Sequence, residues 1–372
     1  MYTGKHLLKR MEVDMSITIG YKLTPDKANI RALIHALAEL NITLQAVAVT
    51  TPVEQRPFGQ PLLTLQHKPL PEYHAGKYTV YLLDSSMSPV EQVVRLLHFN
   101  FDALPLVAEG ESKIIRKLTN NLVVEKFKPS VYSFSKNRYG DVAGTDILRA
   151  RFSAEVFRRM QLSDNAALRR NAFVALIERG DEVYTAQRLV ENSNIEVRVK
   201  RYHIGSPLHR YLYTENYGST QACGSIMRWS RFDQPLVCFD WRHPLTDDKG
   251  NRLADEPISD DYASVWLKDM PSAKALARSS FLFIENLFHQ AGLQLIDICY
   301  FVDKSGHILY GEISPDCMRV REVNQDFDRV DAYDKDLWRE GKSALTLKQR
   351  YEALYYRAFF REKSKEDVCN NY

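Results

Sequence analysis

Residues 294–319, QLIDICYFVDKSGHILYGEISPDCMR, form the stretch that decides the fold. An apolar run over 295–302 is followed by turn-forming residues at 303–306 and by a second run over 307–313. Two such runs separated by a short turn predict a β-hairpin. We expect the rest of the chain to be arranged around this hairpin.

The hairpin places two carboxylates opposite one another if its turn is centred on Lys304 and Ser305. Asp297 then faces Glu312 with the Cβ atoms roughly 4.5–5.5 Å apart, a distance at which like charges repel. A cation between them would relieve the repulsion, and Mg²⁺ holding nucleotide phosphates is typically bound by one or two carboxylates. Alternatively, a bulge at Gly306 slips the register by one residue and sends the two carboxylates to opposite faces.

Length and composition indicate a globular protein with two or more domains. The 372 residues exceed the ~100–200 of a typical domain. A net charge of +3 without a long basic run does not suggest a nucleic-acid partner. No apolar stretch approaches the ~20 residues that span a bilayer, so no membrane partner is expected. The first fifteen residues are charged and lack the apolar core of a signal peptide.

The cysteines indicate a reducing compartment. They are odd in number, widely spaced and without a CxxC motif, which argues against disulfides and a zinc site. We therefore expect a cytoplasmic protein. The five are Cys223, Cys238, Cys299, Cys317 and Cys369.

Residues 1–102 are expected to form a small α/β domain of β-α-β-β-α type. Its helices are marked by Thr24-Pro25 and by the capping pattern that starts at Ser88. The segment 51–75 holds five prolines and is expected to be a long surface excursion. The domain shows no catalytic constellation, so packing, oligomerisation and regulation are all compatible with it. The predicted elements are strands at 16–21, 42–49 and 78–83 and helices after Pro25 and Ser88.

A second domain, residues 103–195, is predicted to open with strands around Gly110-Glu111-Ser112-Lys113. In such a hairpin the backbone N–H groups and a lysine can bind nucleotide phosphates. The motif GxxxxGK[ST] of a Walker A loop is absent. Amphipathic helices are expected at 146–160 and 165–178.

A third region, residues 196–372, begins in a strand that alternates apolar and basic residues. Arg198 and Lys200 lie on one side of it, and the turn Gly205-Ser206 follows. Basic side chains beside a Gly-Ser turn suit an anionic substrate; the alternative is a solvated strand face. Long helices are expected at 271–290 and 346–360.

The order of these motifs resembles the SAICAR synthetase family of ATP-dependent ligases. The resemblance covers about residues 104–345, roughly two thirds of the chain. SPDxxR at 314–319 and DKDxxR at 334–339 are its most specific parts. Weaker similarities are the GESK turn at 110–113, VVEKFKPSVYSF at 123–134, EVRVKRYHIGS at 196–206, DEPIS at 255–259 and the strand start at 295–297.

The resemblance implies an α+β or α/β fold of two lobes with the nucleotide between them. The first lobe is expected to be built on an antiparallel sheet, and the second to be a larger α/β lobe. The implied reaction joins the carboxylate of carboxyaminoimidazole ribotide to the amine of L-aspartate while ATP is split, in purine biosynthesis. ATP and Mg²⁺ are the implied cofactors and small molecules the implied partners; a homo-oligomer is also compatible with it.

The resemblance also implies roles for individual residues. Those implied for catalysis are Lys113, Arg242 and Asp297. Those implied to bind the nucleotide are Gly110, Ser112, Lys113, Glu196 and Glu312, with Asp297 and Glu312 as metal ligands. Those implied to bind substrate are Lys200, Tyr202, Gly205, Ser206, Asp255, Glu256, Ser314, Asp316, Arg319, Asp336 and Arg339.

Several positions depart from the family pattern. Two acids expected to bind metal fall at Phe301 and Gly311, which leaves Asp297 and Glu312 with Asp303 nearby. An asparagine pair at a helix start falls at Arg149-Ala150, a lysine falls at Glu111, and Lys200 stands for an arginine. Two alternatives therefore stay open: a ligase with another acid and amine, or a nucleotide-binding regulatory protein without catalysis.

Overall fold

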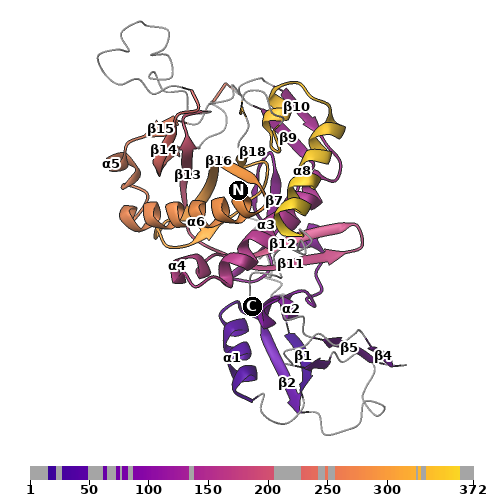
Figure 1. Cartoon of the computed structure of the whole chain (residues 1–372). Helices are drawn as coiled ribbons and strands as arrows, with labels where there is room; N and C mark the ends of the chain where they lie inside the picture. Colours follow the sequence, from indigo (N-terminus) through magenta and orange to yellow (C-terminus); the bar gives the residue numbers. More distant parts are fainter. Residues whose placement is uncertain are drawn as a thin grey trace, which may run out of the picture. The chain divides into compact units, whose positions relative to one another are not determined.

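The computed structural model describes residues 16–21, 27–48, 62–64, 73–75, 78–82, 87–133, 138–204, 228–241, 248–249, 256–323, 326–327 and 332–360 (Figure 1). The chain divides into two compact units. The first comprises Met1–Val107 with Arg116–Val124, and the second Ala108–Ile115 with Glu125–Tyr372. The predicted boundaries after residues 102 and 195 stay predictions.

The first unit holds a five-stranded sheet of order β2-β1-β3-β5-β4. Its pairings are parallel except that of β4 with β5. The predicted excursion over 51–75 is wrong in part, because it contains the strands β3 and β4. The elements are β1 (Ser16–Tyr21), α1 (Lys27–Ala38), β2 (Thr43–Ala48), β3 (Leu62–Thr64), β4 (Tyr73–Ala75), β5 (Tyr78–Leu82) and α2 (Pro89–Val94).

The predicted cap of α2 is confirmed. Ser88 Oγ accepts a hydrogen bond from the backbone N–H of Glu91 at 3.1 Å, which satisfies one of the free donors of the first turn. The helix then buries Val93 and Val94 fully. A 3₁₀ turn, η2 (Phe101–Ala103), follows it.

A second five-stranded sheet has the order β11-β12-β8-β7-β6. The helix predicted over 165–178 is wrong. A four-residue helix, α4 (Ala166–Arg169), is followed by a hairpin that turns at Gly180, whose φ is +57°. The run Phe173-Val174-Ala175-Leu176-Ile177 suits either a buried helix or a strand, and pairing with the next strand decides for the strand. The strands are β6 (Leu106–Glu109), β7 (Lys113–Lys117), β8 (Leu122–Phe127), β11 (Phe173–Arg179) and β12 (Glu182–Arg188).

The third sheet carries the hairpin around which the chain is arranged. Its order is β15-β14-β13-β16-β17, and β18 also pairs with β16. All its pairings are antiparallel. The strands are β13 (Asn192–Tyr202), β14 (Arg231–Trp241), β15 (Glu256–Ile258), β16 (Leu293–Asp303), β17 (Leu309–Tyr310) and β18 (Met318–Glu322).

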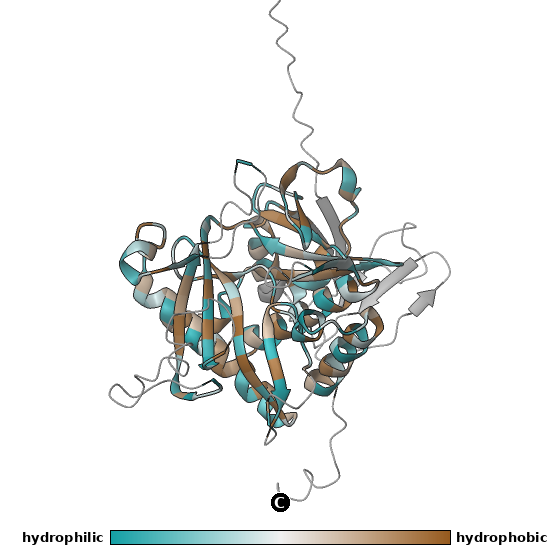
Figure 2. Ribbon diagram, turned by 90° about the horizontal axis from the view of Figure 1, so that it is seen from above, coloured by the Kyte–Doolittle hydropathy of each residue, from teal (hydrophilic) through white to brown (hydrophobic). Residues whose placement is uncertain are grey.

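One face of this sheet is apolar and the other is polar, because successive side chains of a strand point to opposite faces. Val197, Ile298 and Val320 are fully buried in a core shared with Phe281 and Ile284 of α6 (Met270–Gln290). Hydrophilic and hydrophobic residues alternate along the strands in Figure 2. The polar face is therefore left for charged side chains.

The register of the central hairpin differs from the prediction. Phe301 pairs with Tyr310 and Val302 with Leu309, so the turn is two residues longer than expected. Gly306 lies in it with φ +87°, and its missing Cβ leaves room for the backbone oxygen of Asp269.

The predicted pairing of Asp297 with Glu312 is wrong. The strand after the turn ends at Tyr310, and Asp297 instead pairs with Lys200 on one side and Arg319 on the other.

The remaining elements complete the second unit. They are β9 (Ser130–Ser133), β10 (Arg138–Asp141), α3 (Thr145–Gln161), α5 (Asp260–Ala263), α7 (Asp336–Arg339) and α8 (Ala344–Phe359). Within the described ranges, no helix has the length and apolar character needed to cross a membrane.

Candidate functional site

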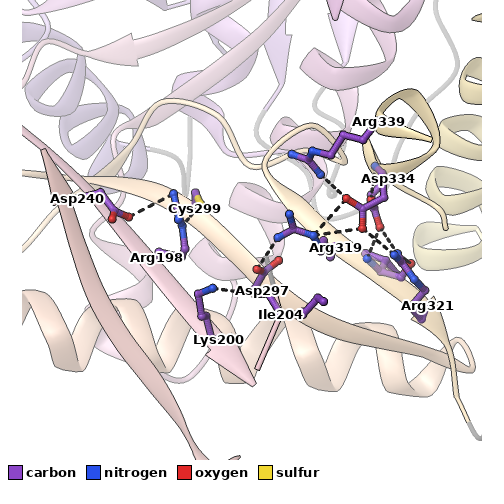
Figure 3. A network of polar contacts seen from close by, with 12 residues as sticks. Arg198, Lys200, Ile204, Asp240, Asp297, Cys299, Arg319, Arg321, Asp334 and Arg339 are labelled. Carbon is purple, nitrogen blue, oxygen red and sulfur yellow. Dashed lines mark hydrogen bonds and ion pairs between the residues drawn. The ribbon is translucent and has the colours of Figure 1, made fainter. Parts of the chain in front are cut away.

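Three adjacent strands place alternating charges side by side on the polar face of the third sheet. Lys200 of β13 is paired in register with Asp297 of β16, which is paired with Arg319 of β18. Arg319 Nη1 donates to Asp297 Oδ2 at 2.7 Å (Figure 3). The row is nearly closed to solvent, since Lys200 is 6% and Asp297 3% exposed. The alternative of a solvated strand face is wrong for Lys200.

Arg319 also contacts a second carboxylate. Its Nε donates to both oxygens of Asp336 at 3.2 Å, and Arg321 and Arg339 bind the same carboxylate. Arg321 Nη1 further donates to Asp334 at 2.7 Å. We call these residues together with Lys200 and Asp297 the Arg319 cluster (Figure 3). The structure thus brings together five of the predicted residues: Lys200, Asp297, Arg319, Asp336 and Arg339.

The environment of Lys200 opposes its charge. Burial is the main cause that lowers its pKa, and the nearby charges of Arg198 and Arg319 lower it further, against the opposite effect of Asp297. Its Nζ donates to the backbone oxygen of Ile204 at 2.8 Å. The ammonium therefore lies where an additional anion would stabilise its protonated form.

Arg198 lies two residues before Lys200 on the same face of β13. Its Nη2 lies 3.1 Å from Glu196 of the same strand and 3.2 Å from Asp240, which is paired in register with Glu196. Glu196, predicted near the nucleotide, is paired in register with Phe301 on β16. The position that an acid was expected to fill therefore presents an aromatic ring, 5.7 Å from the ring of Tyr310.

Asp316 is held by a separate set of partners. Lys335 Nζ donates to it at 2.9 Å and the Tyr351 hydroxyl at 3.2 Å. Burial raises the pKa of Asp316, but the Lys335 and Arg149 charges more than offset this and bring it to about 2. The carboxylate is therefore ionised in the folded protein at neutral pH.

Acid should weaken the protein through this group. An unfolded aspartate has a pKa of about 3.9, so the contribution of Asp316 is complete above that pH and is lost as pH falls towards about 2. Lys335→Met should cost about 2 kcal/mol of unfolding free energy at pH 6 and much less near pH 2.5. Urea unfolding at both pH values measures this, with the exposed Lys342→Met as control. An equal loss at both pH values would contradict the assignment.

A second group of polar residues surrounds Lys113 of β7. Lys113 Nζ donates to Glu125 Oε2 at 3.2 Å and lies 5.5 Å from the centre of the Phe127 ring. Thr185 and Gln187 of β12 donate to the same oxygen at 3.3 and 3.2 Å. Glu125 is only 2% exposed, so this buried carboxylate fixes Lys113 at the edge of solvent. We call these residues with Gly311 the Lys113 cluster.

Gly311 is fixed by two backbone hydrogen bonds to one side chain. Its N–H donates to Gln187 Oε1 at 2.9 Å, and its oxygen accepts from Gln187 Nε2 at 2.7 Å. Its φ of +84° favours glycine, and a Cβ here would lie 3.3 Å from Phe301 and 3.7 Å from Lys113 Nζ. Glycine therefore lets the backbone approach the lysine closely.

Glu312 is bound by an arginine from a helix. Arg149 of α3 donates from Nε and Nη2 to the two carboxylate oxygens at 2.7 and 2.9 Å, and Ser314 Oγ donates to one of them. Burial raises the pKa of Glu312, but the Arg149 charge offsets this, and the net pKa lies below its usual value.

The residues predicted to hold a metal do not fit one as they are placed. Asp297 and Glu312 each carry an arginine at hydrogen-bonding distance instead of facing one another. Among the described residues, no group of three or more His, Cys, Asp or Glu is arranged to bind a metal ion.

The predicted phosphate turn is an exposed hairpin end. Gly110 N–H donates to the oxygen of Lys113 at 3.0 Å, and no atom lies within 4 Å of the place where a Gly110 Cβ would be. The backbone oxygen of Ser112 accepts from the N–H of Lys128 at 2.8 Å. The Lys128 ammonium also closes the turn by bonding to Glu109 and Gly110.

The other predicted residues lie apart or outside the described part. Tyr202 is buried at the end of β13 with its ring 5.2 Å from that of Phe327, and Glu256 is exposed at the start of β15. The predicted residues outside the described ranges are Gly205, Ser206, Arg242 and Asp255.

Sequence reasoning missed the residues that hold the predicted ones in place. Glu125 and Gln187 hold Lys113 and Gly311, while Arg321 and Asp334 hold Asp336. A signal was available for Glu125, since a glutamate within the apolar strand LVVEKF must be either at an edge or paired.

Comparison with known proteins identifies the family of this chain. The model of the SAICAR synthetase family matches residues 106–354. A phosphoribosylaminoimidazole-succinocarboxamide synthase of Sulfolobus acidocaldarius is 25% identical over 252 residues, which cover 67% of this chain and 96% of that protein. The bifunctional cordycepin biosynthesis cluster protein 3 of Cordyceps militaris is 27% identical over 283 residues, covering 64% of this chain but only 31% of that protein.

The fold agrees as well. A solved SAICAR synthetase in complex with ADP is 19% identical with a TM-score of 0.53, covering 70% of this chain and all of that one. The predicted α/β architecture is thereby confirmed. The family match spans well over half of the chain, and we conclude that the chain belongs to the SAICAR synthetase family.

Proposed function

We propose that this chain is an ATP-dependent ligase that joins a carboxylate to an amine. The observation that carries the proposal is the row Lys200–Asp297–Arg319, which is buried on the polar face of the third sheet with further cations around Asp336. The chain that carries this row belongs to a family of ligases. Buried cations are costly unless they are paired. Their concentration on one face suits a substrate that brings several negative charges.

The reaction type follows from the chemistry of carboxylates. A carboxylate is a poor acyl donor, so its oxygen first takes the γ-phosphoryl group of ATP and ADP leaves. The amine nitrogen then attacks the carbonyl carbon, a C–N bond forms, phosphate departs and the nitrogen releases a proton. Such chemistry gains most from positioning the reactants and from cations beside the phosphoryl oxygens.

Lys113 is proposed to bind the phosphates of ATP. Glu125 and the Phe127 ring fix its ammonium next to the turn that holds Gly110 and Ser112. The ADP complex of the structural relative supports a nucleotide in this fold. Magnesium is proposed to arrive bound to ATP. Glu196 is proposed to lie near the nucleotide.

Removing the Lys113 ammonium should weaken nucleotide binding. A hydrogen bond to a charged group contributes about 1.5–3 kcal/mol, so Lys113→Ala should raise the ADP dissociation constant roughly 10- to 100-fold. Isothermal titration calorimetry measures it. Lys126→Ala is the control, because Lys126 lies on the neighbouring strand in an exposed pair with Glu182. Equal ADP affinity for wild type and Lys113→Ala would exclude this assignment.

The Arg319 cluster is proposed to bind the acid substrate, with carboxyaminoimidazole ribotide as the acid and L-aspartate as the amine. An arginine fork matches a carboxylate or phosphate with two parallel hydrogen bonds. Ser206 and Arg242 are proposed to complete this side. We further propose a cytoplasmic role in purine biosynthesis.

A second candidate is a ligase of the same type with another acid and amine. Phe301 and Gly311 stand where the family pattern has acids, and one relative is named for a cordycepin biosynthesis cluster. A panel of ribotide acids and amino acids, scored by ADP formation, separates the two candidates.

Hydroxylamine provides the test of the acyl phosphate. With MgATP, the carboxylate substrate and hydroxylamine but no amino acid, the protein should form a hydroxamate and ADP in equal amounts. ADP formation without hydroxamate would contradict an acyl phosphate. Nucleotide binding with neither product, from any acid in the panel, would favour a regulatory protein without catalysis.

A further inference from the structure

Arg149 and Glu312 form an ion pair that leaves the carboxylate few free positions. The guanidinium binds both carboxylate oxygens at 2.7 and 2.9 Å, and Ser314 Oγ adds a bond to one of them. The Arg149 side chain is fully buried and that of Glu312 is 8% exposed. A carboxylate that is bound in this way has little capacity left for an ion from solvent.

Arg149 is held in place independently of Glu312. Its Nη1 donates to the backbone oxygens of Lys128 at 3.2 Å and Ser130 at 3.4 Å. One turn further along α3, Ser153 Oγ bonds to the backbone oxygen and N–H of Ile313 at 2.9 and 3.1 Å. The helix therefore fixes the guanidinium and the segment that carries Glu312 relative to one another.

The other carboxylates around Glu312 are bound by side chains as well. Asp316, whose charge acts on Glu312, accepts from Lys335 Nζ at 2.9 Å and from the Tyr351 hydroxyl at 3.2 Å. The position next to Glu312 is Gly311, beside the ring of Phe301. The carboxylate of Glu125 is bound by Lys113, Thr185 and Gln187. A divalent cation prefers several oxygen ligands, and those near Glu312 are already bonded to side chains.

We propose that Arg149 takes the place of a protein-bound divalent cation beside Glu312, so that this chain holds no metal through that carboxylate. The inference deepens the proposed function: its consequence for nucleotide binding rests on the proposal that the chain binds ATP. A metal at Glu312 would have to displace a buried guanidinium and leave it without its anion, which is strongly unfavourable. The Lys113 cluster then offers the nucleotide the Lys113 ammonium, and no metal held by Glu312.

Binding of Mn²⁺ to the full chain tests the proposal. Electron paramagnetic resonance measures this binding in the presence and in the absence of ADP. The key comparison is between wild type and the double variant Arg149→Gln with Glu312→Gln. This neutral pair leaves no buried charge without its partner. We expect the Mn²⁺ dissociation constants of these two proteins to agree within about 2-fold. Wild-type binding at least 10-fold tighter than that of the neutral pair would overturn the proposal.

The single substitution Arg149→Gln should create a site. It frees the Glu312 carboxylate, so Mn²⁺ affinity should rise at least 10-fold and the thermal midpoint should increase with Mn²⁺. Ser153→Ala is the matched control, because it loosens the same segment without changing its charge. A folded Arg149→Gln protein without this gain would also overturn the proposal. If it does not fold, the comparison with the neutral pair decides.

The design separates this proposal from the proposed function. Absence of ADP binding in wild type would refute the nucleotide assignment. The measurements without ADP would still report whether Glu312 binds a metal.

Discussion

Replacing Arg149 with alanine should destabilise the protein by about 3–5 kcal/mol, the usual cost of removing one partner of a buried ion pair. Glu312 would keep its burial but lose both guanidinium bonds, and the backbone oxygens of Lys128 and Ser130 would lose a donor. Domains are stable by only about 5–15 kcal/mol, so the loss is large. The midpoint of urea unfolding measures it.

Two controls separate the pair from a general effect on the helix. Arg151→Ala, on the same helix in an exposed pair with Glu178, should change stability by less than about 0.5 kcal/mol. The neutral pair Arg149→Gln with Glu312→Gln should recover a large part of the loss, because no buried charge is left alone. A loss as large as that of Arg149→Ala would refute the ion-pair explanation.

Replacing Arg319 with alanine should lower kcat/KM for the acid substrate by about 10²–10³-fold, the range found when one preorganised hydrogen-bond donor to a reacting group is removed. Arg319 is the residue that bridges Asp297 and Asp336, so its loss also removes one cationic partner from each of these carboxylates. Steady-state kinetics with varied acid at saturating MgATP measures the effect.

Nucleotide binding should be unaffected by the Arg319→Ala substitution. ADP affinity of Arg319→Ala should stay within about 2-fold of wild type, in contrast to Lys113→Ala. Arg278→Ala on α6, on the opposite face of the sheet, is the control for loss of an arginine. A parallel fall of ADP affinity and kcat/KM would mean that the two clusters do not divide the substrates as proposed.

Local patterns predicted several of the elements in both units. The strand that carries Lys200, the long helix α6 and the cap at Ser88 follow from alternation, helical periodicity and capping chemistry. The strand β11 was predicted as helix, because an apolar run of this length fits both and only the partner strand decides.

Side-chain partners could not be predicted in the same way. Glu312 and Arg149 are 163 positions apart in the chain, and no local pattern relates them. The register of the central hairpin depended on a turn two residues longer than its residues suggested. That difference replaced an expected pair of carboxylates with two carboxylate–arginine pairs.

The most direct test of the central claim is ADP release from MgATP with carboxyaminoimidazole ribotide, measured with and without L-aspartate. We predict rapid release only when both substrates are present, with the amide formed in equal amount. No release under either condition, while ADP still binds, would contradict a ligase acting on these substrates and would mean that the family's fold is kept without this reaction.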